Sequence, residues 1–222
     1  MIEENLISWN GAFARIVPEN DAEDRNVMDC WGHLENDGKY HIRFNLSEHY
    51  PSGKYHIAYI ALKDSARNEI NIYDYGSVLS KENLDFYVPT ITPDLVGPQL
   101  DLDKITIEAM PTNPTNPDGE TKVKITYYVK DNLSGYDHGK YVLRDPQGLT
   151  HYEYTYTENY GRLYFKGDPT VWTKYEINVI LPKGSAPGIW GLEELTLWDM
   201  SEKGKTYNFT EIIHFEIFSW DK

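Results

Sequence analysis

Apolar and polar residues alternate along many short segments of this chain. Residues 39–46 place Tyr, Ile, Phe and Leu at every second position, and residues 121–130 do the same with Val, Ile, Tyr and Val. A period of two is typical of a strand with one buried face. Clusters of Pro, Gly, Asn and Asp separate the segments, as turns between strands require. The pattern predicts strands at 39–46, 55–62, 68–75, 84–88, 105–110, 121–130, 141–143, 152–157, 162–166, 175–181, 192–197 and 206–218.

Helix signals are scarce by comparison. No window of about 11 residues keeps a convincing helical apolar period. The chain contains 18 Tyr residues, and aromatic residues favour strands. Short strands separated by turn signals are typical of an antiparallel β-sandwich. The sequence therefore predicts an all-β protein.

One segment of the sequence occurs twice. Residues 39–64 align without a gap on residues 174–199, at a constant offset of 135. The repeat predicts two tandem modules, which we place at 1–92 and 93–222. Modules in tandem arrays act as spacers or binding units more often than as catalysts. The identical pairs are Lys39/Lys174, Tyr40/Tyr175, Ile42/Ile177, Leu46/Leu181, Gly53/Gly188, Leu62/Leu197 and Asp64/Asp199.

The two modules differ in how they begin. The second opens near residue 94, and the same opening in the first would lie 135 residues earlier, upstream of residue 1. Either the first module is a shorter variant, or its opening strands precede this chain. We favour the second explanation, which predicts an exposed sheet edge and a part-open core in the first module.

The repeated residues have structural explanations. Gly53 and Gly188 lie in turns between predicted strands, where glycine accepts a positive φ at little cost. Asp64 and Asp199 end the next strand, where a carboxylate accepts hydrogen bonds from nearby backbone amides. Because they are repeated, these residues are poor candidates for a unique active site.

Composition narrows the choice of partner and compartment. The net charge of −14 argues against nucleic acid, because phosphate binding needs clustered Lys and Arg. No stretch has the roughly 20 apolar residues of a membrane-spanning helix. A single cysteine, Cys30, excludes an internal disulfide framework, and we expect it to be a small buried residue. The N-terminus lacks the features of a signal peptide. We expect a piece of a longer bacterial protein that is extracellular or on the cell surface.

A known family becomes visible in the second module. The segments that carry it are DLVGPQL at 94–100, DNLSG at 131–135, RDPQG at 144–148, APGIW at 186–190 and LTLWDMS at 195–201. This series resembles the tandem bacterial immunoglobulin-like modules of secreted and surface proteins. In the first module, SGKY at 52–55 and DSARN at 64–68 resemble the last two elements of the pattern. The second module departs from the pattern after Asp199, where the usual Gly-Asn ending is missing.

The resemblance implies a fold and a general role. It implies immunoglobulin-like β-sandwiches, and it supplies no catalytic residues. The role it implies is a non-catalytic spacer or adhesion region that contacts a host or matrix protein or a glycan. The alternative is an accessory, carbohydrate-binding region of a secreted glycoside hydrolase or peptidase. No G-x-S-x-G, H-E-x-x-H or P-loop pattern occurs in the sequence.

Aromatic residues supply the candidate binding site. Tyr152, Tyr154 and Tyr156 share one face of a predicted strand, and Glu153 and Thr155 share the other. An exposed tyrosine face would offer a stacking or adhesive surface. An inward tyrosine face would be core, and the sequence favours either core or a half-covered sheet.

Metal binding is the remaining chemistry to weigh. Calcium is the better candidate, with oxygen ligands at Asp101 and Asp103, in the loop 131–137, or in the acidic cluster 19–24. Asx-turn capping explains Asp131 and Ser134 without an ion, so the prediction is no cofactor, with calcium as an open possibility. The histidines at 33, 41, 49 and 56 form only a loose group, and solvated histidines explain them better than a zinc site does.

Overall fold

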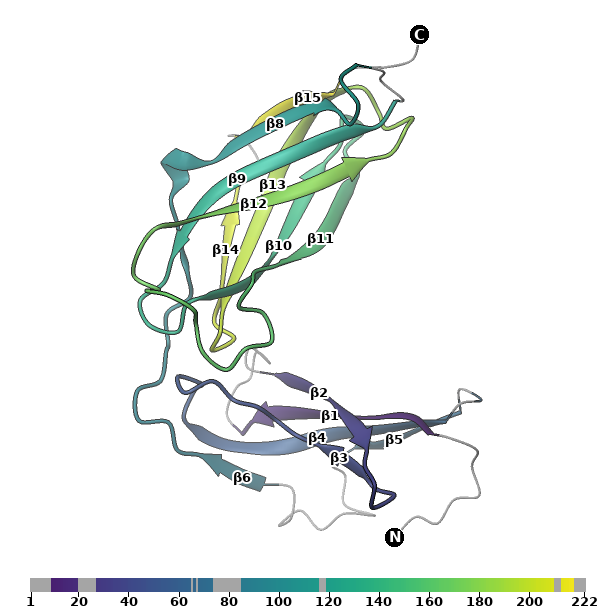
Figure 1. The fold of residues 1–222 in the computed structure, drawn as a ribbon, viewed down its shortest axis with the longest axis vertical. Coiled ribbons are helices and arrows are strands. Elements are labelled where there is room, and N and C mark those ends of the chain that lie inside the picture. The colour runs from purple at the N-terminus through teal and green to yellow at the C-terminus, as the bar shows by residue number, and fades with distance from the viewer. Residues whose placement is uncertain are drawn as a thin grey trace. The chain divides into compact units, whose positions relative to one another are not determined.

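The computed structural model describes residues 9–19, 27–64, 66, 68–73, 85–115, 119–209 and 213–217. It is all-β with antiparallel sheets, and the one helical element among these residues is a short 3-10 helix. The chain forms two compact units, Met1–Pro93 (unit 1) and Asp94–Lys222 (unit 2). The division lies one residue after the boundary drawn from the repeat. Figure 1 shows the strands of both units.

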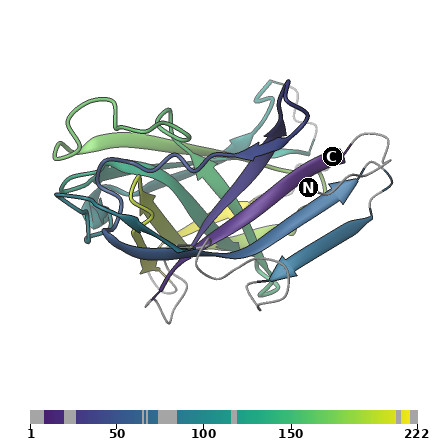
Figure 2. The ribbon, with the colours of Figure 1, turned by 90° about the horizontal axis from the view of Figure 1, so that it is seen from below.

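Unit 1 contains a single sheet among its described residues. The strand order is β3-β2-β1-β4-β5, and β6 pairs with the other half of β4. Figure 2 shows β1, in purple, between its neighbours. The core is small: Ile16, Tyr50, Tyr55 and Val88 are buried together. The strands are β1 (Trp9–Pro18), β2 (Met28–Leu34), β3 (Tyr40–Ile42), β4 (Gly53–Asp64), β5 (Glu69–Tyr73) and β6 (Asp85–Val88).

Unit 2 contains two sheets that pack around one core. One sheet has the order β11-β10-β13-β14 with β15 on β13, and the other has the order β12-β9-β7 with β8 on β9. The elements are β7 (Gln99–Leu100), η2 (Leu102–Lys104), β8 (Thr106–Pro111), β9 (Thr121–Lys130), β10 (Tyr136–Arg144), β11 (Thr150–Tyr156), β12 (Thr173–Leu181), β13 (Gly188–Asp199), β14 (Gly204–Asn208) and β15 (His214–Ile217).

The alternating pattern of β9 shows how the core of unit 2 forms. Val123, Ile125, Tyr127 and Val129 are buried, and the residues between them are only partly buried. They meet Leu195 and its neighbours from the opposite sheet in one cluster, which Figure 1 shows as two layers of strands. Burial of these side chains from both sheets supplies the main stabilisation of the unit.

The sequence repeat is also a structural repeat. β4 and β13 have the same length, and β5 and β14 follow them at the same offset and in the same register. The Tyr55 hydroxyl donates a hydrogen bond of 2.8 Å to the carbonyl of Pro51, and Trp190 Nε1 donates one of 2.9 Å to the carbonyl of Ala186. The repeated aromatic residues therefore perform the same structural task in both units.

The repeated glycines are less alike than their positions suggest. Gly188 has a φ of 124°, in the region that favours glycine. Gly53, with a φ of 158°, is close to extended backbone. The predicted positive φ is thus found at both glycines, well inside the glycine region at Gly188 and near its edge at Gly53.

Several predicted strand limits were wrong; residues 43–46 of the predicted strand 39–46, for example, lie beyond the end of β3. Residues 162–166 form a loop, in which Arg162 Nε bonds the carbonyl of Glu158 and the amide of Lys166 bonds Asn159 Oδ1. The segment 206–218 holds two strands: β14 ends at Asn208 and β15 begins at His214. The strands β1 and β2 were missed altogether. Parts of other predicted strands, residues 74, 75 and 84, lie outside the described residues.

Candidate functional site

The register of β10, β11 and β13 decides where the tyrosines of β11 point. Tyr152, Tyr154 and Tyr156 lie opposite Val142, Lys140 and His138. The intervening residue Tyr141 is buried in the core. Since side chains alternate across a sheet, the three tyrosines lie on the outer face. Their exposed fractions are 68%, 48% and 55%.

Of the alternatives left open by the sequence, the three tyrosines are therefore not core. β11 is the last strand of its sheet among the described residues, so neither of its faces is fully covered. Glu153, on the opposite face, reaches inward only to accept a hydrogen bond of 3.0 Å from the Tyr141 hydroxyl. On an edge strand of this kind, alternation alone does not reveal which face is inward.

The exposed tyrosines belong to a larger group of rings. His138 stacks on Trp198 with ring centroids 5.0 Å apart and an angle of 8° between the planes. Tyr156 contacts Tyr160 at 4.3 Å, and Tyr154 lies 6.4 Å from Trp198. We call this group the aromatic face; its members are Tyr152, Tyr154, Tyr156, Tyr160, His138 and Trp198.

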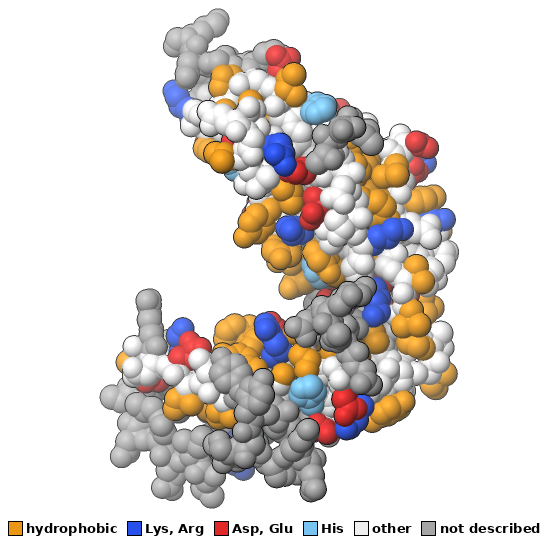
Figure 3. Space-filling view, turned by 180° about the vertical axis from the view of Figure 1, so that it is seen from behind, with side chains coloured by type: hydrophobic (Ala, Val, Ile, Leu, Met, Phe, Trp, Pro, Cys, Tyr) orange, Lys and Arg blue, Asp and Glu red, His pale blue; other side chains and the backbone are white. Residues whose placement is uncertain are grey.

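Polar side chains occupy the same face of the sheet. The Lys140 ammonium lies 5.5 Å from the centroid of Tyr152 and 3.4 Å from a carboxylate oxygen of Glu194. The Thr196 hydroxyl bonds that same oxygen at 3.1 Å and the Thr206 hydroxyl at 2.9 Å. Seen from behind, unit 2 shows hydrophobic side chains lying among basic, acidic and His side chains (Figure 3). The surface thus combines apolar rings with fixed hydrogen-bonding groups.

A polar cleft of about 400 Å³ adjoins the aromatic face at Tyr156. Besides Tyr156, the side chains that line it include Glu158, Lys166, Asp168 and Lys174. Charged groups of both signs border this cleft, which suits a neutral, hydroxyl-rich ligand better than a polyanion.

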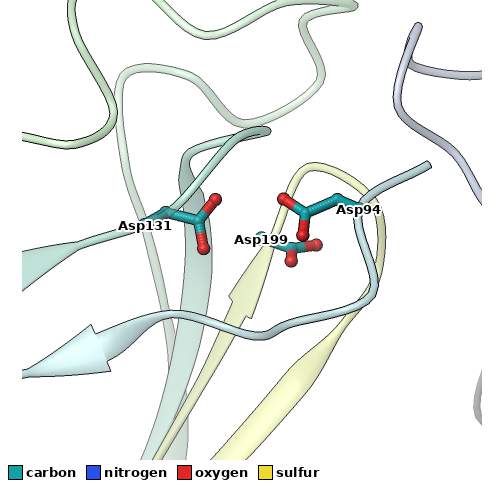
Figure 4. Close-up of side chains that lie close together, drawn as sticks. All are labelled: Asp94, Asp131 and Asp199. Carbon is teal, nitrogen blue, oxygen red and sulfur yellow. The ribbon is translucent and has the colours of Figure 1, made fainter. Parts of the chain in front are cut away.

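A second group of side chains that could form a site lies at an end of the sandwich in unit 2. The carboxylates of Asp94, Asp131 and Asp199 come from three separate segments, and one oxygen from each lies within 4.8 Å of the others. Figure 4 shows the three groups pointing toward one another. All three residues are buried. We call this group the carboxylate cluster.

Backbone amides hold each member of the carboxylate cluster in place. Asp94 Oδ2 accepts a hydrogen bond of 2.8 Å from the amide of Ser134, and Oδ1 accepts from Val96 and from the Asn132 side chain. Asp131 Oδ2 accepts from Leu133 and Gly135. Asp199 Oδ1 accepts from the amides of Ser201 and Lys203, at 2.7 and 2.9 Å.

The surroundings of the cluster shift the pKa values of its three aspartates. Burial raises the pKa of Asp199 to about 8, with the charges of Asp131 and Asp94 adding to the effect. Burial also raises the pKa of Asp131. For Asp94, burial opposes ionisation, but the amides of Ser134 and Val96 outweigh it and lower the pKa. Two unit charges about 4 Å apart repel by about 4 kcal/mol at an effective dielectric constant of about 20, so full ionisation of the bare cluster is unfavourable.

The calcium candidates chosen from the sequence are only partly in this cluster. Asp131, from the loop 131–137, is a member. Asp101 instead caps η2 and pairs with Lys104 at 2.9 Å, and Asp103 is not a member. Glu19 pairs with Lys54, and residues 20–24 lie outside the described part of the chain. The sequence analysis did not select Asp94 and Asp199 as candidate ligands, because their spacing in sequence carries no metal signature.

The candidate histidines at 33, 41, 49 and 56 and the cysteine belong to unit 1 and lie outside both groups. His41 contacts Asp37 at 3.0 Å, and His49 bonds the carbonyl of Thr92. Cys30 is partly buried, and its thiol donates to the carbonyl of Arg43 at 3.2 Å. Burial and the charge of Asp29 raise the pKa of Cys30, which disfavours the reactive thiolate.

Comparison with known protein families finds no family model that matches the chain, and comparison with curated proteins finds no matching sequence. In the described part of the chain, no helix is long and apolar enough to cross a membrane.

Proposed function

We propose that this chain is a non-catalytic pair of immunoglobulin-like modules from a bacterial surface or secreted protein, and that it acts in adhesion by binding carbohydrate through the aromatic face of unit 2. The observation that carries the proposal is the exposure of the β11 tyrosines beside ordered polar groups.

The strand order of unit 2 supports the immunoglobulin-like assignment. We take β7 and β8 as strand A, β9 as B, β10 as C, β11 as C′, β12 as E, β13 as F, and β14 with β15 as G. The two sheets then hold A, B and E, and C′, C, F and G, a division close to that of immunoglobulin-like sandwiches. The bonds from Tyr55 and Trp190 to a backbone carbonyl upstream resemble the tyrosine corner at the start of strand F.

The chemistry of the aromatic face supports a glycan ligand. A sugar ring has apolar C–H faces that stack on aromatic rings, and hydroxyls that need donors and acceptors at its rim. Tyrosine offers both an apolar ring and a polar tip. The mutual packing of Tyr156 and Tyr160 at 4.3 Å orders these rings before binding, which lowers the entropy cost of association. Lys140, Glu194 and Thr196 supply hydrogen-bonding groups on the same face.

The alternative role uses the same face. An accessory region of a secreted glycoside hydrolase or peptidase would bind polysaccharide in order to hold a catalytic domain near its substrate. The two roles differ in what they require of the reading frame: further modules and a wall anchor would favour adhesion, and a catalytic domain would favour the accessory role.

A glycan array probed with the full chain tests the proposal. We expect retention on a defined class of neutral glycans and, for Tyr154→Ala, a loss of affinity of roughly tenfold or more. Tyr87→Ala is the matched control, since Tyr87 is 66% exposed but lies on β6 of unit 1. A silent array, or an equal loss in the control, would overturn the proposal. Binding to a matrix protein that depends on Tyr154, without glycan binding, would overturn the carbohydrate assignment.

A further inference from the structure

We propose that the carboxylate cluster of Asp94, Asp131 and Asp199 binds one Ca²⁺ ion. This inference is independent of carbohydrate binding, because it uses other residues of unit 2. The convergence of the three carboxylates within 4.8 Å is its starting point.

Two carboxylate oxygens of the cluster have no hydrogen-bond donor in the part of the chain that the structure describes and are therefore candidate metal ligands; we call them the bare oxygens. Asp131 Oδ1 and Asp199 Oδ2 are buried and have no hydrogen-bond donor among the described residues. The two residues are only 3% and 0% exposed. A buried carboxylate oxygen without a partner is costly, and buried charges are normally paired or bound to a metal. Here both bare oxygens belong to one small cluster.

The other oxygens of Asp131 and Asp199 show why these are bare. Asp131 turns Oδ2 to the amides of Leu133 and Gly135, and Asp199 turns Oδ1 to those of Ser201 and Lys203. Backbone amides thus hold one oxygen of each carboxylate, and the other oxygen is left without a hydrogen-bond donor among the described residues. Asp94 accepts hydrogen bonds on both oxygens, but a carboxylate oxygen has a further lone pair for a metal.

The size and chemistry of the cluster fit Ca²⁺. This ion is bound by oxygen ligands at about 2.4 Å, so ligands on opposite sides of it are about 4.8 Å apart. The three carboxylate oxygens lie within 4.8 Å of one another, which does not exceed the separation that two ligands of one such ion can have. Mg²⁺ holds its ligands at about 2.1 Å and keeps several of its waters, so a compact, buried carboxylate group suits it less well. Among the described residues, none of the three carboxylates forms an ion pair with a Lys, Arg or His side chain.

A bound cation would join three segments of unit 2. Asp94 is the first residue of the unit, Asp131 follows β9, and Asp199 ends β13. The ion would therefore fix the entry of the chain to both sheets of the sandwich. The competing occupant is a proton shared among the carboxylates, and it makes the opposite prediction about added calcium.

Calorimetric titration of the full chain, freed of metal with EGTA and dialysed, tests the inference with CaCl₂ as the probe. We expect one Ca²⁺ per chain and a thermal midpoint that rises with calcium concentration. Asp199→Asn is expected to weaken binding by more than about tenfold. Asp64→Asn is the matched control at the equivalent position of unit 1, and Asp101→Asn removes an acidic residue outside the cluster; both are expected to bind as the unchanged chain does.

Other measurements keep the test decisive. If Asp199→Asn fails to melt cooperatively in EGTA, Asp131→Asn takes its place, because its amide oxygen still accepts from Leu133 and Gly135. Tb³⁺ luminescence sensitised by nearby aromatic residues is expected to fall when Ca²⁺ competes. An unchanged midpoint with no binding heat at millimolar calcium would overturn the proposal, as would equal losses in Asp64→Asn. Stronger binding of Mg²⁺ would overturn the assignment to Ca²⁺.

Discussion

The strands that end at Asp64 in unit 1 and at Asp199 in unit 2 are closed by equivalent hydrogen bonds. The amide of Asn68 donates to Asp64 Oδ1 at 2.8 Å, and the amide of Lys203, at the equivalent position, donates to Asp199 Oδ1 at 2.9 Å. The amides of the two aspartates also bond back to the carbonyls of these same residues. The two aspartates thus make the same backbone hydrogen bonds to the residue four positions later in each unit.

The two turns differ in the side chain four positions after the aspartate. Asn68 Nδ2 donates to Asp64 Oδ2 at 2.8 Å, so both oxygens of Asp64 have partners, and this bond lowers the pKa of Asp64. Asp199 Oδ2 lacks a donor among the described residues, and the pKa of Asp199 rises to about 8 because of burial and the nearby carboxylates. A turn residue in one unit has become a candidate metal ligand in the other.

The largest expected difference between the two units is the cost of removing a core side chain from each. Leu195 is fully buried between the sheets of unit 2, whereas Ile60, its equivalent at the offset of 135, is only partly buried. We expect Leu195→Ala to cost about 2–5 kcal/mol of unfolding free energy and Ile60→Ala clearly less, because β4 belongs to a single sheet. Hydrogen exchange of the amides in β13 and β4 reports each unit separately. Equal costs would show that the core of unit 1 is as closed as that of unit 2.

Alkaline pH tests a feature of the core of unit 2. The hydroxyls of Tyr127 and Tyr136 lie 3.0 Å apart, and burial raises the pKa of Tyr127 to about 12. A raised folded-state pKa gives stability that is complete below the unfolded pKa of about 10 and is lost as the pH rises through about 12. A shift of about two pKa units corresponds to about 2–3 kcal/mol. Free energies of unfolding between pH 9 and 12 measure this loss.

Tyr127→Phe is the control for the alkaline measurement. It keeps the ring and removes the ionising group, so the loss of stability with pH should become smaller. Absorbance at 295 nm should show late-titrating tyrosines in the folded protein. If every tyrosine titrates together near pH 10 in the folded chain, the interpretation of this pair is wrong.

Much of the strand pattern could be predicted because alternation is strong where one face is buried. The predicted strand 121–130 coincides with β9, whose inward residues are all apolar or threonine. β1 gave no such signal, because its buried positions include the small residues Ala12 and Ala14. On β11 the alternation was read correctly, but the sequence pattern could not decide which face is exposed, since an edge strand buries little on either side.

The carboxylate cluster was beyond sequence reasoning for a different reason. Asp94, Asp131 and Asp199 are far apart in the chain and meet only through the fold. The repeat also concealed Asp199, because its equivalence to Asp64 gave it a sufficient role as a turn residue. The missing Asn at position 203 was visible as a departure from the family pattern, but its consequence for Asp199 Oδ2 appears only in the structure.

Exchanging the residues at the two turns gives the smallest and most specific effect. Lys203→Asn places in unit 2 the amide that satisfies the carboxylate in unit 1. If the backbone of the turn is unchanged, the new Nδ2 donates to Asp199 Oδ2, and we expect stability without calcium to rise by about 1 kcal/mol. The same bond occupies the oxygen that is proposed to bind the ion, so calcium affinity should fall. Asn68→Ala, which removes the same amide from unit 1, should destabilise unit 1 without changing calcium binding. Denaturant unfolding in EGTA and calorimetry measure the two effects, and a Lys203→Asn chain that binds calcium with unchanged affinity would show that the bare oxygen of Asp199 does not hold the ion.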